Sequence, residues 1–207
     1  MSDVLRVQWK VVPASAPQPW LKCSRCRGAT RFRTSDKIRV NASGKRIDAW
    51  LIYRCTSCDN TWNRPILERQ PVSTIDPRLL SALQANDPAL SRRLAFDASA
   101  LRQAFRVEHF DDVLVSKAAM ARGPLEPCRL EIACVVPEPT GLRVDRLLAA
   151  ELRLSRSRIQ DMEDAGRLAA WPGGLRRPVR HGLCVKISLL GVPDGDRIVL
   201  AATGGEA

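Results

Sequence analysis

Two short stretches, Cys23-Ser-Arg-Cys26 and Cys55-Thr-Ser-Cys58, decide the fold that we expect for the first third of this chain. Turns of this kind at the ends of strands can hold four thiolates about 2.3 Å from one Zn²⁺ in a closed tetrahedron. Four sulfur ligands leave no open coordination position, so the ion would be structural and not catalytic. The spacing therefore predicts one structural zinc ion per chain, bound by Cys23, Cys26, Cys55 and Cys58.

The 28 residues between the two pairs (27–54) have the pattern of an antiparallel hairpin. Strand-like alternation runs through 30–33, 37–40 and 49–54, and Asn41-Ala-Ser-Gly-Lys45 supplies the turn. We therefore expect a zinc-ribbon-like β domain. Unliganded buried cysteines or a redox pair are the alternative, although a thioredoxin-like dithiol needs only one Cys-x-x-Cys motif, next to a βαβ pattern. Cys128, Cys134 and Cys184 lack ligand spacing and are expected to be ordinary half-buried residues.

The charge of the chain favours a polyanionic partner. Its 207 residues include 33 Lys and Arg against 22 Asp and Glu, a net charge of +11. Residues 1–70 carry most of the excess, with 14 basic and 5 acidic residues. No apolar run approaches the ~18 residues of a membrane span, and the first residues lack a secretory signal. We therefore expect a cytoplasmic protein that does not associate with membranes.

Proline clusters divide the chain into three expected domains: 1–70, 71–137 and 138–207. The middle one is expected to be helical, because Asp76-Pro77 and Asp87-Pro88 each place an N-cap before proline at the first helical position. One or two strands follow, at 113–116 and 129–136. With the β domain before it and a mixed domain after it, the fold class is α+β.

Aromatic residues alternate with arginines around the cysteine pairs. Exposed rings could stack on unpaired bases while guanidinium groups neutralise phosphates. Packing in the small core of the β domain is the better interpretation for Trp50, Tyr53 and Trp62. The runs Pro19–Cys26, Phe32–Cys55 and Thr61–Asn63 resemble the bacterial domain-of-unknown-function 1062 family. The resemblance spans most of the chain, including Asn86-Asp87 and Phe96-Asp97, and brings no established activity with it.

Residues 142–188 carry the sharper functional argument. In Leu142–Leu152, Val144, Leu147, Leu148 and Leu152 share one helical face, while Arg143, Arg146 and Arg153 share another. Ser155 is a suitable N-cap for a second helix over 156–165, which Gly166 can close. Arg156 and Arg158 lie in its first turn, where positive charge opposes the helix dipole and is easier to explain as a phosphate ligand.

Two helices followed by a small β element resemble the S4 RNA-binding domain, a module of ribosomal protein S4, pseudouridine synthases and tyrosyl-tRNA synthetases. The resemblance implies contacts with the RNA backbone at the following positions: Arg143, Arg146, Arg156, Arg158, Arg167 and Arg176.

We therefore expect an RNA-binding accessory protein that recognises structured RNA, either rRNA or tRNA, through arginine–backbone contacts. The ribosome or one of its subunits would be a partner of this kind. The alternative is a protein-interaction adaptor or DNA-associated regulator in which a degenerate S4 unit serves only as scaffold. The sequence has no Gly-rich phosphate loop, Gly-x-Ser-x-Gly elbow or His-Glu-x-x-His motif, so we identify no catalytic constellation.

Overall fold

The computed structural model describes residues 3–97, 100–101, 105–120 and 127–205. The chain divides into two compact units, and each is α+β with one five-stranded sheet. We call Ala16–His109 the cysteine unit and Met1–Ser15 with Phe110–Ala207 the two-segment unit. The expected fold class is thus confirmed at the level of α+β. None of the helices within the described ranges is both long enough and apolar enough to cross a membrane.

The cysteine unit contains the predicted antiparallel sheet, with the strand order β5-β4-β3-β2-β6. Its strands are β2 (Gln18–Cys23), β3 (Gly28–Ser43), β4 (Arg46–Cys55), β5 (Thr61–Pro71) and β6 (Val107–Glu108). The β3–β4 hairpin pairs as far as Ser43 and Arg46, so its turn is only Gly44 and Lys45. Gly44 has φ +60°, a conformation that suits glycine.

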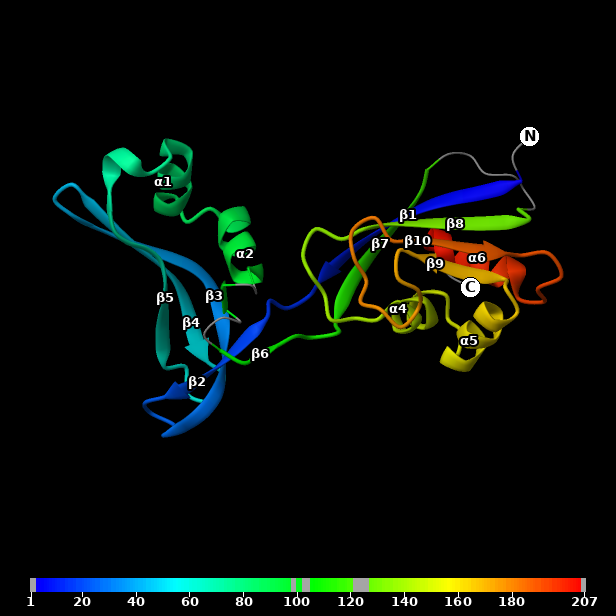
Figure 1. Cartoon of the computed structure of the whole chain (residues 1–207), viewed down its shortest axis with the longest axis horizontal. Helices are drawn as coiled ribbons and strands as arrows, with labels where there is room; N and C mark the ends of the chain where they lie inside the picture. Colours follow the sequence, from blue (N-terminus) through cyan, green and yellow to red (C-terminus); the bar gives the residue numbers. More distant parts are fainter. Residues whose placement is uncertain (1–2, 98–99, 102–104, 121–126, 206–207) are drawn as a thin grey trace. The chain divides into compact units, whose positions relative to one another are not determined.

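Two helices pack on one face of this sheet, as Figure 1 shows. After the short 3₁₀ helix η1 (Val72–Thr74) come α1 (Pro77–Gln84) and α2 (Pro88–Phe96). The Asp76 carboxylate accepts hydrogen bonds from two backbone N–H groups of α1, and Asp87 accepts one from Leu90. Both predicted N-caps are thereby confirmed. Leu83 and Leu90 pack with Ala49 of β4, so these helices belong to the same unit as the sheet.

Successive residues of β4 point to opposite faces of the sheet, so its two aromatic residues, Trp50 and Tyr53, lie on different faces. Tyr53 is fully buried beneath the helices, and Trp62 of β5 packs against it with ring centroids 5.2 Å apart. The prediction that these two rings fill the core is confirmed. It is wrong for Trp50, because Ala49 and Leu51 point into the core and Trp50 therefore points to the opposite face of the sheet.

The two-segment unit is built on a second sheet, with the order β7-β1-β8-β10-β9. Its strands are β1 (Val4–Pro13), β7 (Val113–Ala119), β8 (Arg129–Val135), β9 (Leu168–Trp171) and β10 (Cys184–Ser188). The strands expected near 113–116 and 129–136 are confirmed. β1 pairs in parallel with β8 and antiparallel with β7, and it buries Val7, Trp9 and Val11 completely.

Three helices complete this unit: α4 (Val144–Glu151), α5 (Arg156–Asp164) and α6 (Gly195–Thr203). The predicted apolar face of α4 is buried in the core, with Val144, Leu147, Leu148 and Leu152 each at most 1% exposed. Ser155 caps α5 by accepting a hydrogen bond from the Arg158 N–H, as predicted.

The contacts divide the chain differently from the prolines. Residues 1–15, expected in the first domain, supply an interior strand, β1, of the two-segment sheet. The expected middle domain, 71–137, is shared, because α1 and α2 join the cysteine unit whereas β7 and β8 join the two-segment sheet. Long-range strand pairing decides this division, and only the boundary between Ser15 and Ala16 falls within a proline cluster, that of Pro13, Pro17 and Pro19.

Candidate metal centre and basic hollow

The two Cys-x-x-Cys stretches form matching turns at one end of the sheet. β2 ends at Cys23 and β4 ends at Cys55, so the first cysteine of each pair closes a strand. The residue after each second cysteine, Arg27 or Asp59, has a left-handed backbone with φ 56° or 55°. This conformation turns the chain back into the next strand and leaves both sulfurs of a pair on the same side.

The four sulfur atoms meet in one cluster. All lie within 4.8 Å of one another, with 3.6 Å between Cys23 and Cys58 and 3.9 Å between Cys26 and Cys55. Four ligands at about 2.3 Å from a tetrahedral ion would lie about 3.8 Å apart, so the spacing fits a single metal ion. The sequence-predicted set Cys23, Cys26, Cys55 and Cys58 is therefore brought together.

The backbone around the cluster favours thiolates at the first cysteine of each pair. The N–H of Cys26 and then that of Arg25 lower the pKa of Cys23. Burial alone would raise the pKa of Cys55, but the Thr30 hydroxyl and the N–H groups of Ser57 and Cys58 lower it to about 6. A hydrogen bond with Cys58 raises the pKa of Cys26 to about 12. These donors suit a metal-thiolate site, in which N–H groups point at the coordinating sulfurs.

The three remaining cysteines lie apart from this cluster, in the two-segment unit. Cys134 is buried on β8, and burial raises the pKa of its thiol to about 12. Cys128 and Cys184 are partly exposed. Within the described residues these three join no metal-ligating group. Cys128 and Cys184 are half-buried as expected, whereas Cys134 is buried more deeply.

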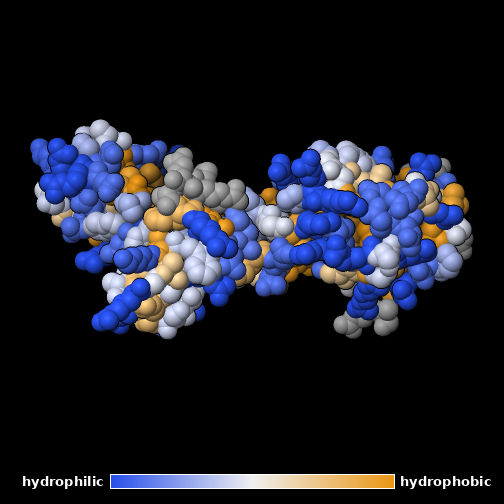
Figure 2. All heavy atoms as spheres, turned by 60° about the horizontal axis from the view of Figure 1, so that its bottom comes forward, coloured by the Kyte–Doolittle hydropathy of each residue, from blue (hydrophilic) through white to orange (hydrophobic). Residues whose placement is uncertain are grey.

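A basic hollow lies on the two-segment unit where α4 and α5 begin. It has a volume of about 400 Å³ and is lined by the following residues: Arg143, Asp145, Arg156, Ser157, Gln160 and Arg176. Three arginines face one carboxylate there, so the lining carries an excess of two positive charges. Hydrophilic residues cover most of the face that this unit turns toward the viewer in Figure 2.

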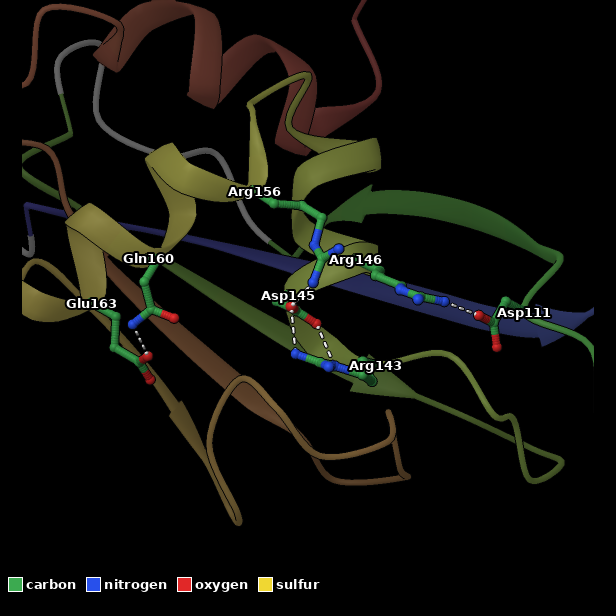
Figure 3. A network of polar contacts seen from close by, with 7 residues as sticks. All are labelled: Asp111, Arg143, Asp145, Arg146, Arg156, Gln160 and Glu163. Carbon is green, nitrogen blue, oxygen red and sulfur yellow. Dashed lines mark hydrogen bonds and ion pairs between the residues drawn. The ribbon is translucent and has the colours of Figure 1, made fainter.

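Asp145 holds two of these arginines in place. Arg143 donates to both oxygens of the Asp145 carboxylate, at 3.0 and 2.7 Å, and Arg156 donates at 3.1 Å from the next helix (Figure 3). Asp145 is only 9% exposed. Burial raises the pKa of its carboxyl, but the hydrogen bonds from Arg143 and Arg156 outweigh burial and lower the pKa below its usual value. The clamp fixes both guanidinium groups at the mouth of the hollow.

The other three arginines expected to contact RNA lie outside the hollow. Arg146 pairs with Asp111, on the segment before β7 (Figure 3). Arg158 lies 3.9 Å from Asp194, and Arg167 donates at 2.8 Å to the carbonyl of Leu190. The structure thus separates the six predicted arginines into two sets: three line the hollow, and three are bonded to other residues of the two-segment unit.

Sequence reasoning missed Asp145, Ser157 and Gln160 as parts of this site. Asp145 was not identified from the sequence as part of a site, although it orients Arg143 and Arg156. The sequence did contain a signal for Asp145, because this acidic residue lies two positions after Arg143, in the first turn of α4.

Comparison with curated proteins gave no significant match, and comparison with solved structures gave none. A family of sequences does match, over residues 40–171. The matched region contains the second cysteine pair and both helices of the basic hollow, and it begins after Cys23 and Cys26. Because the match spans more than half of the chain, the protein belongs to the family described as Protein of unknown function (DUF1062).

Proposed function

We propose that this protein is an RNA-binding accessory factor that grips the backbone of structured RNA in the basic hollow and uses a zinc ion to hold the cysteine unit together. The observation that carries the proposal is the convergence of Arg143, Arg156 and Arg176 on one open hollow. Ribosomal or transfer RNA, and with it the ribosome or a subunit, is the proposed partner, and the cytoplasm is the proposed location.

The chemistry of the hollow suits a phosphate group. Guanidinium groups bind phosphate oxygens in a bidentate fashion, and the N-terminus of α5 adds a partial positive charge at the same place. Arg176 lies in the loop between β9 and β10 and is exposed. It has no acidic partner among the described residues. Its charge is therefore available to a ligand.

Structured RNA is favoured over other polyanions by the order of elements. α4, α5, β9 and β10 follow one another as two helices and a small β element, the order of the S4 domain that the sequence resembles. Contacts through arginine read the shape of a backbone and carry little base specificity. We therefore assign recognition to the fold of the RNA and not to its sequence.

Zinc is the ion that we propose for the cysteine cluster. Four thiolates at tetrahedral spacing select ions such as zinc or iron. Zinc is redox-inactive and forms four-coordinate structural sites of this kind. Since no coordination position stays open, the ion contributes stability to the cysteine unit and takes no part in a reaction.

Charge reversal at Arg176 tests the RNA site with the least disturbance, because this side chain does not hold Asp145. We expect Arg176→Glu to weaken binding of an RNA hairpin about tenfold and to reduce the salt dependence of log K by about 1. Arg197→Glu on α6 makes the same charge change outside the hollow and should bind as the unaltered protein does. Equal affinity of both variants would contradict the proposal and favour the alternative, an interaction adaptor or DNA-associated regulator.

A further inference from the structure

The cysteine unit has a second surface that neither the metal site nor the basic hollow explains. It is the face of the β3–β4–β5 sheet opposite α1 and α2, which we call the outer face. The strand register places Arg39 beside Trp50 and Arg33 beside Arg54. Directly paired residues of antiparallel strands point to the same side, and residues two apart along a strand do too. Within β3 and β4 the outer face therefore includes the following: Arg33, Arg39, Asn41, Ser43, Arg46, Asp48, Trp50, Ile52 and Arg54.

The described helices of this unit leave the outer face open. α1 and α2 pack through Leu83 and Leu90 against Ala49, which points the other way from Trp50. Trp50 belongs to neither apolar cluster of the unit and is partly exposed. A partly exposed ring in the middle of a sheet face that none of the described helices covers is available for stacking.

The charge on the outer face is positive. Among the residues of this face that pair between β3 and β4 there are four arginines and one acid, Asp48, whose carboxylate accepts the backbone N–H of Arg69. Asp59, from the adjoining turn, pairs with Arg33 at 3.2 Å. Arg39, directly beside Trp50, is exposed and has no partner among the described residues. An unpartnered guanidinium next to an open indole ring is suited to a ligand that carries both negative charge and flat rings.

We propose that the outer face binds an unpaired nucleotide strand, with a base stacked on Trp50 and the neighbouring phosphates held by Arg39 and its flanking arginines. Single-stranded nucleic acid combines these two features at every nucleotide, and proteins that bind it combine aromatic platforms with basic side chains. An acidic peptide would use the arginines but not the ring. The inference is independent of the basic hollow, which lies in the other unit.

The test measures binding of the full-length, metal-replete protein to a fluorescent oligouridine strand of about 12 nucleotides. Trp50→Leu should weaken binding about five- to tenfold, because stacking of a base is lost. Trp50→Phe, which restores a ring, should recover most of the affinity. Trp171→Leu removes another exposed indole, on β9, and should have no effect. If the two leucine variants bind alike, the proposal is overturned.

A second pair of variants guards against loss of folding. Arg39→Glu changes an exposed side chain and should weaken oligouridine binding, whereas Arg78→Glu on α1, also exposed, should not.

An abasic strand of equal length keeps its phosphates but lacks bases, so it should bind the unaltered protein about as weakly as oligouridine binds Trp50→Leu. Full-affinity binding of the abasic strand would contradict stacking. A matching DNA strand shows whether the sugar matters, since equal binding places recognition in the bases and phosphates alone.

The same variants separate this inference from the proposed RNA site. Trp50→Leu should leave binding of a blunt RNA hairpin without unpaired nucleotides unchanged, and Arg176→Glu should leave binding of the oligouridine strand unchanged. Failure of one prediction therefore leaves the other intact.

Discussion

The sulfur atoms of Cys23 and Cys58 lie 3.6 Å apart, although 35 positions separate the two residues along the chain. Each belongs to a different turn, one between β2 and β3 and the other between β4 and β5. An ion held between these turns would tie four strands together at one end of the sheet. The small apolar cluster beside it contains Cys23 and Cys55 themselves, so the metal site and the core of this region form one structure.

Removal of the metal should therefore loosen the cysteine unit and spare the two-segment unit. Structural zinc sites contribute about 10–16 kcal/mol in small peptides, so loss of the ion should abolish cooperative folding near the cluster. Hydrogen exchange measured before and after chelation should show lost protection in residues 18–71 and retained protection in β1 and β8. Unchanged protection throughout would contradict a structural metal.

Alanine at Cys55 and Cys58 should have the same effect as chelation, because two of the four ligands are removed. Mass spectrometry under native conditions should find one zinc ion in the unaltered protein and none in the double variant. Cys128→Ala, outside the cluster, should retain the ion. Retention of near-native cooperativity by the double variant, without bound metal, would disprove the assignment.

Lys117 should be a large contributor to the stability of the two-segment unit. Its ammonium group donates to the carbonyls of Glu151 and Ala201 near the ends of α4 and α6, at 3.0 and 2.9 Å, and pairs with the Glu151 carboxylate. The side chain is only 13% exposed. Lys117→Met removes the ammonium donor from both carbonyls and the charge that pairs with the Glu151 carboxylate, leaving the Ala201 carbonyl only the 3.4 Å bond from the Gly204 N–H among the described residues. The substitution should cost about 2–4 kcal/mol. Urea denaturation would measure this loss, and Lys10→Met, an exposed site on β1, should change stability by less than about 0.5 kcal/mol.

The Asp145 clamp should give the two-segment unit a defined dependence on pH. Because the pKa of this carboxyl is lowered on folding, its contribution is complete above the unfolded value of about 3.9. That contribution is lost as the pH falls through the lower, folded value. Asp145→Asn should therefore be less stable than the unaltered protein near neutral pH, and the difference should shrink on acidification below about pH 4.

Urea denaturation at several pH values would test this prediction. Asp161→Asn on α5 is a suitable control, because Asp161 is exposed and its side chain has no partner among the described residues. A stability difference between Asp145→Asn and the unaltered protein that stays constant with pH would show that the clamp is not electrostatic.

Features set by neighbouring residues could be predicted from the sequence. Cysteine spacing identified the cluster, Asp-Pro pairs identified the starts of α1 and α2, and Ser155 identified the start of α5. The helix caps depend on contacts between residues two or three positions apart, and each Cys-x-x-Cys pair lies within a single turn. Capping hydrogen bonds and tight turns of this kind contribute about 1 kcal/mol each and leave a local signature.

Features set by contacts between distant residues could not be predicted from the sequence. β1 pairs in parallel with β8, which lies more than a hundred residues later, so nothing near Val4–Pro13 indicates that this strand lies inside the second sheet and not at its edge. The partner of Arg146 is Asp111, 35 residues earlier. The outward direction of Trp50 depended on which face of β4 the helices cover. These features are decided by tertiary packing, which a pattern along the chain does not contain.

The central claim is that the protein prefers structured RNA, and binding of an RNA hairpin and a DNA duplex of equal length over a salt series tests it most directly. The account predicts tighter binding of the RNA than of the DNA at near-physiological salt. It also predicts that the slope of log K against log salt concentration becomes shallower in Arg176→Glu. Weak binding of both nucleic acids, lost together as salt rises, would contradict it.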